Sequence, residues 1–190
     1  AFYGPKLDFM GKDALGREHQ VATIQFDFNQ PEGFNLSCID ENGAQERIAM
    51  VHCAVMGSIE RFLAVYIEHT GGKFPVWVAP EQIRIVTPNQ DEKVVELAQK
   101  IADEAKKKYG LRVELDTSNE SVGKKIRESE MQKVPYLVVV GAKELESGLV
   151  IPRVRGDMQD KEGDIKPLKI DDFLKAVADE AKSRVSKSSI

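Results

Sequence analysis

Thr23, Gln25 and Asp27 place a hydroxyl, an amide and a carboxylate on one face of a segment whose other face is apolar. Such alternation is typical of a β-strand, in which successive side chains point to opposite faces. The row could hydrogen-bond a polar small molecule. It could also face solvent, as one face of an antiparallel sheet usually does, and the pattern alone favours solvent. Gln20 falls on the opposite face by parity, unless a β-bulge re-aims it.

His52 and Cys53 stand side by side before a predicted helix, and Cys38 is the other cysteine of the chain. Imidazole and thiolate groups bind zinc, but adjacent ligands with one distant cysteine lack the paired spacing of most zinc sites. The spacing alone therefore favours a structural histidine and a small buried cysteine.

Ser58 and Arg61 share one side of the predicted helix, beside its apolar stripe. Ser58 could cap the helix, and Gly57 before it permits a close backbone approach. Arg61 could stack on a flat ring or clamp a phosphate, because its guanidinium is planar and always charged. It could equally form an exposed pair with Glu60, and the pattern leaves both possibilities open.

The composition is that of a globular protein of one or two domains: 190 residues, 42% hydrophobic, with 31 acidic and 27 basic side chains. The formal charge of -4 argues against a protein that coats nucleic acid through bulk charge, so we expect no DNA partner. No run has the length of a membrane span, and no signal-peptide pattern is present. Two cysteines are too few for a disulfide framework, which favours the reducing cytoplasm.

The first part of the chain predicts an antiparallel sheet with one long helix. Asn42-Gly43 is a strong two-residue hairpin signal, and Gly71-Gly72 is expected to end the helix. The predicted elements are strands at Phe2–Met10 and Glu18–Phe28, a hairpin over residues 34–51, and a helix at Ser58–Thr70. Because a chain seldom starts inside a strand, we expect further sequence upstream of Ala1.

The second part alternates between strands and helices, which predicts a mixed sheet flanked by helices. We expect Asp171 or Asp172 to cap the last helix and residues 183–190 to form a frayed tail. The predicted elements are strands at Ile83–Val86, Arg112–Leu115, Tyr136–Val140 and Leu149–Val154, and helices at Asp91–Lys108, Val122–Met131 and 171–185.

Four segments occur in an order and spacing typical of one family: FYGPKLDF, GREHQVATIQFDF, HCAVMGSIERF and FPVWVAPEQ. They resemble the C-terminal part of the catalytic domain of bacterial threonyl-tRNA synthetases, which are class II aminoacyl-tRNA synthetases. The remaining sequence resembles their anticodon-binding domain. The resemblance implies an α/β protein: residues 1–76 form part of the class II antiparallel sheet with its motif 3 helix, and residues 77–190 form a mixed-sheet anticodon-binding domain.

The resemblance implies a ligase that activates threonine with ATP and magnesium and transfers it to threonine tRNA. Arg61 matches the motif 3 arginine that stacks on adenine, and Thr23 and Gln25 match residues that line the ATP and threonine pocket. His52 matches a zinc ligand, and that zinc binds the amino and hydroxyl groups of threonine, which excludes valine. Other matched active-site residues are Tyr3, Lys6, Gln20 and Ser58.

The sequence departs from the family in ways that affect catalysis. The other two zinc ligands, motifs 1 and 2 and most of the dimer interface lie upstream of Ala1. Cys53 stands where arginine is common, and His19 where tryptophan is frequent. Because one ligand of three does not hold zinc tightly, we expect this chain alone neither to retain zinc nor to activate threonine. The homodimer is expected for the intact enzyme.

The anticodon-binding domain, by contrast, looks complete. The resemblance places Asn119, Arg127, Glu144 and Arg153 where the family reads anticodon bases and their phosphates. Carboxylate and guanidinium groups can each make paired hydrogen bonds to unstacked base edges. Glu144 and Arg153 are expected on facing strands around the ESG turn.

The neighbouring residues carry less information. Ser118 and Ser121 stand where the family often has basic residues, so we expect weaker contacts to the phosphates of the tRNA. For Lys124 and Lys125 a solvated helix face is the expected environment.

Two other interpretations remain. The chain could be a stand-alone, non-catalytic tRNA-binding module derived from a class II synthetase. It could also come from the histidyl, prolyl or glycyl enzymes, which share this type of anticodon-binding domain. The histidine before AVMGSIERF and the Thr23/Gln25 pair favour threonine.

Overall fold

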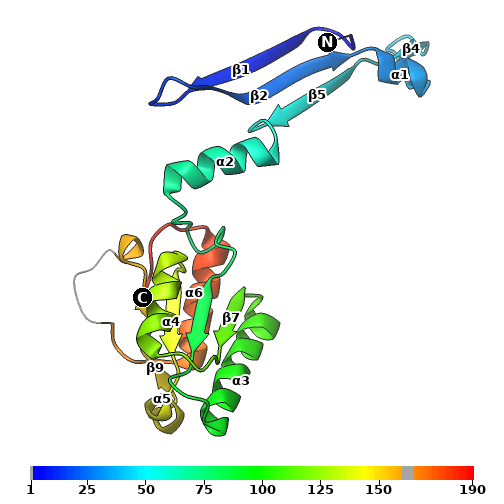
Figure 1. The fold of residues 1–190 in the computed structure, drawn as a ribbon. Helices are drawn as coiled ribbons and strands as arrows, with labels where there is room; N and C mark the ends of the chain where they lie inside the picture. Colours follow the sequence, from blue (N-terminus) through cyan, green and yellow to red (C-terminus); the bar gives the residue numbers. More distant parts are fainter. Residues whose placement is uncertain (1, 160–164) are drawn as a thin grey trace. The chain divides into compact units, whose positions relative to one another are not determined.

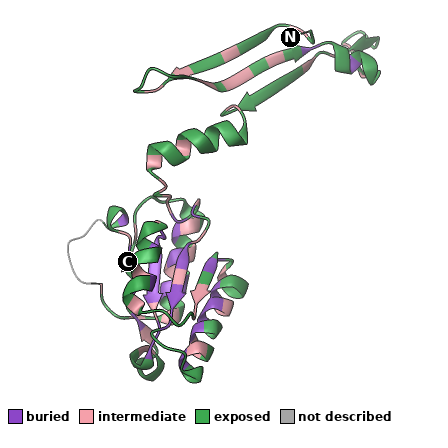
Figure 2. Ribbon diagram, in the orientation of Figure 1, coloured by how far each residue is buried: buried purple, intermediate pink, exposed green. Residues whose placement is uncertain are grey.

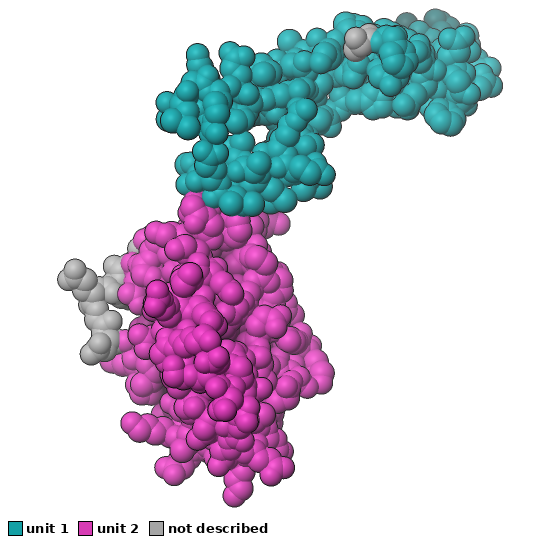
Figure 3. Space-filling model, viewed as in Figure 1, with its two compact units in different colours: residues 1–69 teal, residues 70–190 magenta. Residues whose placement is uncertain are grey.

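The computed structural model describes residues 2–159 and 165–190. The chain divides into two compact units, Ala1–His69 and Thr70–Ile190, which are coloured separately in Figure 3. The boundary expected from the sequence, after residue 76, falls within the second unit.

The first unit contains a three-stranded antiparallel sheet in the order β1-β2-β5, formed by β1 (Lys6–Lys12), β2 (Glu18–Asp27) and β5 (Met50–Val55). The expected strand at Phe2–Met10 is wrong in its start, because the chain before Lys6 forms a turn. The backbone amide of Phe26 bonds the carbonyl of Pro5 at 3.0 Å, so this turn still lies along β2.

A short helix, α1 (Asn29–Gly33), follows β2 and had no sequence signal. The Asn42-Gly43 turn is confirmed: Gly43 has a φ of +78° and joins β3 (Ser37–Ile39) to β4 (Gln45–Arg47). The predicted hairpin is smaller than expected, since Met50 belongs to β5, which pairs with β2. The long helix is confirmed as α2 (Ile59–Thr70).

The first unit has almost no apolar core. Asp27 and Pro31 are the only buried residues among residues 2–69, and α2 buries none (Figure 2). On the sheet face opposite Thr23 and Gln25, Ile24 is 37% exposed and Val55 is 72% exposed. Burial of apolar surface is the main driving force of folding, so the described residues of this unit stabilise it weakly.

The second unit is built on a four-stranded sheet in the order β10-β8-β6-β7 (Figure 1). The strands are β6 (Ile83–Val86), β7 (Val113–Asp116), β8 (Tyr136–Val139) and β10 (Arg153–Val154). The first three are parallel, and β10 pairs antiparallel with β8. The predicted strand at Leu149–Val154 is two strands, because β9 (Leu149–Val150) leaves the sheet to pair with β11 (Leu168–Lys169).

The helices form two layers around the sheet. Helices α3 (Glu92–Tyr109) and α6 (Ile170–Ser183) supply the apolar core with residues such as Ile101 and Phe173, whereas α4 (Val122–Met131) contacts β6 and β8. The remaining pieces are α5 (Ala142–Ser147) and a 3-10 turn at Gly156–Met158. None of the helices in the described part of the chain has the length and hydropathy needed to cross a bilayer.

Two expectations about the C-terminal region are wrong. Neither Asp171 nor Asp172 caps α6, because the helix begins at Ile170 and both residues lie within its first turn. The Asp171 carboxylate instead accepts hydrogen bonds from Lys108 and from the Tyr109 hydroxyl at 2.5 Å. The tail is not frayed either: the Ser189 amide and hydroxyl bond Glu180 at 2.6 and 2.7 Å. Burial and the Glu180 carboxylate together raise the pKa of the Tyr136 hydroxyl, which donates to Glu180 at 2.7 Å.

The connector at residues 74–80 is bound to the second unit through its main chain. The Arg155 guanidinium donates to the carbonyl of Phe74 at 2.8 Å, and Arg112 donates to that of Ala79 at 2.8 Å. The amide of buried Gln82 donates to Val76 at 2.8 Å. Because three side chains satisfy these carbonyls, the connector is part of the second unit.

We expect the two sheets to differ in hydrogen exchange. Strands β2 and β6 are both central and paired on both sides, so their ladders are matched, but only β6 lies in an apolar core. Amides of β6 should exchange near the rate of global unfolding, and those of β2 much faster. Hydrogen exchange of the whole chain, followed by mass spectrometry, measures this; equal protection of the two strands would contradict it.

Candidate functional site

A β-bulge places Gln20 on the polar face of the first sheet. Phe9 pairs with Ala22 but Met10 pairs with Gln20, so β2 holds one extra residue at this point. The bulge reverses the parity of the strand before it. Gln20 therefore lies beside Thr23 on the polar face. The sequence pattern allowed this position only if the strand contained a β-bulge.

Asp8 contacts three other side chains of this polar face. Its carboxylate accepts the Thr23 hydroxyl at 2.7 Å and the Gln20 amide at 2.9 Å, and the Lys6 ammonium lies 2.7 Å away. Gln20 also contacts the Thr23 hydroxyl. The hydrogen bonds from Lys6 and Thr23 hold the pKa of Asp8 below its ordinary value. The four side chains thus form one connected network of donors and acceptors.

His52 extends the polar face across the sheet. The register places Lys6 opposite Gln25, and Gln25 opposite His52, in one row. The His52 Nε2 atom bonds Asp27 Oδ2 at 2.8 Å, and Asp27 Oδ1 accepts the amides of Asn29 and Gln30 at 2.9 and 3.0 Å. Asp27 is 1% exposed, and these bonds, chiefly that from Gln30 and then that from His52, lower its pKa. A carboxylate behind an imidazole fixes the orientation of the ring.

The residues present do not complete a metal site. In residues 2–159 and 165–190, no three histidine, cysteine or acidic side chains gather closely enough to hold an ion. Cys53 follows His52 in β5 and so points to the opposite face of the sheet. His52 is thus a single candidate ligand, and the described residues do not fit a zinc ion on their own.

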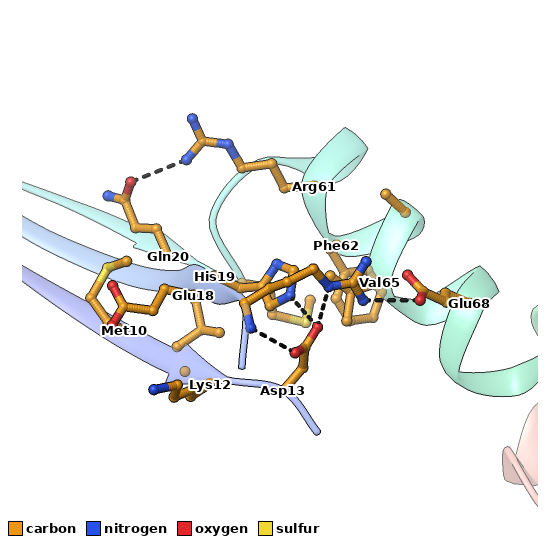
Figure 4. A pocket seen from close by; sticks show the side chains of 15 residues that line it. Met10, Lys12, Asp13, Glu18, His19, Gln20, Arg61, Phe62, Val65 and Glu68 are labelled. Atoms are coloured by element: carbon orange, nitrogen blue, oxygen red, sulfur yellow. Dashed lines mark hydrogen bonds and ion pairs between the residues drawn. The ribbon is translucent and has the colours of Figure 1, made fainter. Parts of the chain in front are cut away.

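Arg61 joins helix α2 to the polar face (Figure 4). Its guanidinium donates to the Gln20 side-chain oxygen at 3.1 Å, and its amide bonds the Ser58 hydroxyl at 3.3 Å. Gly57, with a φ of +71°, lies so close to β2 that a Cβ atom there would stand 2.6 Å from the Gln20 carbonyl oxygen. The turn before α2 is therefore packed directly on the strand that carries Gln20 and Thr23.

Arg61, Gln20 and His19 line a cleft of about 880 Å³ between the β1–β2 hairpin and α2. At its far end the Asp13 carboxylate bonds Arg17 at 2.6 Å and His19 at 3.0 Å, and Arg17 bonds Glu68 of α2 at 2.9 Å (Figure 4). The hairpin and the helix are thus joined by polar bonds at both ends of the cleft.

Tyr3 is not part of this network in the structure. It lies in the turn before β1, where its ring packs on Phe2 with centroids 4.0 Å apart. Its carbonyl accepts the amide of Phe28 at 3.0 Å. Its assignment to the active site stays a prediction.

A second candidate site lies at the carboxyl ends of the parallel strands of the second unit. The chain runs from β6 through α3 to β7 on one side, then through α4 to β8 on the other side of β6. This reversal is a topological switch point, where open α/β sheets generally bind their ligands. Gly141, after β8, lies so close to Pro88, after β6, that a Cβ atom there would stand 3.3 Å from the proline ring.

Of the predicted anticodon residues, the structure places Asn119 and Glu144 at this edge, after the carboxyl ends of β7 and β8, whereas Arg127 lies along α4 and Arg153 lies opposite the second residue of β8. Asn119 lies in the loop after β7, Arg127 on α4, and Arg153 opens β10 opposite Leu137; all three are exposed. Glu144 lies on α5 rather than on a strand, so the expected facing strands are wrong. Its carboxylate accepts the amide of Gly141 at 2.9 Å and so caps the start of α5, whereas the ESG segment forms the end of this helix.

Sequence reasoning missed the roles of three charged residues. Asp8 received no role because its network depends on the bulge. Asp27 was named in the polar row, but its pairing with His52 was not predicted because the two residues are distant in sequence. Lys125 was expected on a solvated helix face, which is wrong: it is 1% exposed. Lysine is rarely buried without partners, and here the partners are carbonyls of other strands, which leave no sequence signal.

Two family models match the chain. Residues 1–70 match the tRNA synthetase class II core domain (G, H, P, S and T), and residues 82–180 match an anticodon binding domain. A threonine–tRNA ligase of Phocaeicola vulgatus is 46% identical over 187 residues, which cover 98% of this chain and 28% of the relative. That of Carboxydothermus hydrogenoformans is 51% identical over 158 residues, or 82% of this chain and 24% of the relative.

Solved structures agree with these matches. The chain superposes on a structure of the RNA binding domain of threonyl-tRNA synthetase from Cryptosporidium parvum with a TM-score of 0.75 and 38% identity, covering 100% of this chain and 45% of that one. For a threonyl-tRNA synthetase of Aeropyrum pernix the TM-score is 0.61 at 34% identity, covering 96% and 42%. The chain spans about a quarter of the length of the curated relatives it matches.

The close approach of Gly57 can be tested with a matched pair of substitutions. Gly57→Ala and Gly43→Ala both put an alanine at positive φ, +71° and +78°, but only position 57 meets an atom within 4 Å. Both should lose about 1–2 kcal/mol of stability through the left-handed backbone. Only Gly57→Ala should also speed hydrogen exchange around Gln20 at short labelling times. The same effect from both variants would show that the contact does not hold the turn on β2.

Proposed function

Because the chain belongs to the class II aminoacyl-tRNA synthetases and matches their threonine-specific members, we propose that it is the C-terminal part of a threonine–tRNA ligase. The whole protein would activate threonine with ATP and transfer it to threonine tRNA, in the cytoplasm and as a homodimer. The observation that carries the catalytic assignment is the bond from Arg61 to Gln20, which joins the motif 3 helix to a strand lined with polar side chains.

The first unit would bind ATP and threonine. The exposed guanidinium of Arg61 can stack on adenine, since it is planar and held at one end by Gln20. Thr23, Gln25, Lys6 and Ser58 would supply hydrogen bonds around the substrates, and Tyr3 would join them. Magnesium would accompany ATP. His52, held by Asp27, would contribute one of the zinc ligands of the intact enzyme.

The second unit would bind the tRNA anticodon at the carboxyl edge of its sheet. Exposed Arg127 and Arg153 can reach phosphates and base edges, and Glu144 can accept hydrogen bonds with the carboxylate oxygen that does not cap α5. Asn119 lies in a loop at the same edge. The support for this assignment is the switch point of the sheet, because sheets of this topology bind ligands there.

A second candidate is a stand-alone, non-catalytic tRNA-binding module. The observation that favours it is the unequal construction of the two units: the second has its own apolar core, whereas the described residues of the first form almost none. Blotting lysate of the source cells with an antibody against this chain separates the two. A band several times larger than 21.2 kDa indicates the ligase, and a band near that mass indicates the module.

We expect the purified 190-residue chain to show no threonine-dependent pyrophosphate exchange with ATP. The described residues supply one candidate zinc ligand, His52, which is too few to hold the ion that would bind threonine. Exchange without threonine is the background control. Exchange clearly above that background would refute the expectation.

Arg153→Ala should weaken binding of the chain to threonine tRNA far more than binding to a tRNA with another anticodon. A guanidinium that reads a base edge contributes about 1–3 kcal/mol of discrimination, whereas a phosphate contact contributes equally to all sequences. Filter binding of both tRNAs at one salt concentration measures the ratio. Lys106→Ala, which removes an exposed charge on α3, is the control. Equal losses for the two tRNAs would mean that Arg153 contacts only the RNA backbone.

A further inference from the structure

Lys125 is a buried lysine at the edge where the proposed anticodon site lies. Its ammonium donates to the carbonyl of Thr87 at 2.9 Å and to that of Asp116 at 3.3 Å, and it lies 3.7 Å from the Asp116 carboxylate. Thr87 directly follows β6, and Asp116 ends β7. One ammonium group therefore joins the carboxyl ends of two parallel strands to helix α4.

This contact anchors the N-terminal half of α4 to the ends of β6 and β7. The buried residues of the helix are Lys125 and Ser129, both polar, whereas the apolar core lies on the other side of the sheet with α3 and α6. A buried ammonium is costly unless it is hydrogen-bonded and paired. The Lys125 ammonium meets this requirement with two hydrogen bonds to main-chain carbonyls and an ion pair with the Asp116 carboxylate, so the position of the helix start depends on these contacts.

The same group shapes the loop that carries Asn119. The Asp116 carboxylate oxygen that faces Lys125 also accepts the amide of Ser118 at 2.9 Å. The Ser121 hydroxyl then accepts the amide of Lys124 and starts α4. The loop is thus fixed at one end by Asp116, which faces Lys125, and at the other by the Ser121 cap in the turn that carries Lys125; Arg127 follows two residues after Lys125 on the helix.

We propose that Lys125 is a positioning residue for anticodon recognition: it holds the Asn119 loop and α4 in the geometry that reads the bases, without touching RNA itself. The proposal rests on the proposed tRNA-binding function. At 1% exposure Lys125 has no surface with which to contact a phosphate. Its neighbour Lys124 is exposed and pairs with Glu120 at 2.7 Å, so the two lysines form a natural matched pair.

The test compares Lys125→Met with Lys124→Met in the whole chain. Each variant is titrated with threonine tRNA and with the same tRNA carrying another anticodon, at several salt concentrations. Lys125→Met should weaken binding of threonine tRNA by about tenfold and reduce the preference for it, with an unchanged salt slope. Lys124→Met should leave the preference intact. Hydrogen exchange of residues 116–121 should rise in Lys125→Met only.

A local control and a second variant keep the test decisive. Thr87→Val removes a fully buried hydroxyl that has no partner among the described residues, but it retains the carbonyl that Lys125 binds, so RNA binding should not change. If Lys125→Met does not fold, Asp116→Asn replaces it, because the asparagine oxygen still accepts the Ser118 amide while the charge opposite Lys125 is lost. It should also reduce the preference.

Each contrary outcome has one meaning. An unchanged preference in folded Lys125→Met, or in Asp116→Asn if that variant is used, overturns the positioning role. A salt slope reduced by about one in Lys125→Met also overturns it, because Lys125 would then contact a phosphate. If the unmodified chain does not bind threonine tRNA, the proposed function fails instead, and exchange of residues 116–121 alone then reports whether Lys125 orders the loop.

Discussion

The extra residue in β2 is the constraint on which the polar face of the first sheet depends. Without the bulge, Gln20 would point to the apolar side of the sheet, and Arg61 of α2 would lose its partner. With it, one amide side chain connects Asp8 and Thr23 to the helix. Bulges are common next to active sites because they re-aim a side chain, and here the re-aimed side chain links the sheet to α2.

The two units are stabilised by different interactions. In the second, β6 is flanked by two parallel strands, and its residues Ile83 and Ile85 are fully buried in an apolar core. In the first, the described residues bury a carboxylate and a proline, and the tertiary contacts of α2 include an ion pair and a hydrogen bond at two points, Glu68 and Arg61. Exposed ion pairs contribute little free energy. The polar network therefore specifies geometry more than it supplies stability.

Most of the fold could be predicted from sequence patterns, because strands such as Ile83–Val86 and helices such as Val122–Met131 have the periodicity of their structure. The failures have physical causes. Helix α1 is too short to show a period, the ESG segment has the composition of a turn but ends a helix at Gly148, and the tail is fixed by Glu180, a partner on another element. Candidate site residues with a family motif, such as Arg61, could be named. The burial of Asp27 and Lys125 could not be predicted, because burial of a charge depends on partners distant in sequence.

In each unit one buried charge orients exposed polar groups that do not pack against an apolar core. Asp27 is paired with His52 at one end of the first sheet, and Lys125 with the ends of β6 and β7 in the second. In both cases a fully buried charge orients an exposed element: an imidazole in one, a loop and a helix start in the other. Replacing a whole buried ion pair by well-packed apolar groups often leaves the stability of a protein nearly unchanged, so the presence of these pairs is better explained by the orientation of the neighbouring polar groups. The positions of exposed groups at both proposed binding faces thus depend on buried charged residues that need not contact a ligand.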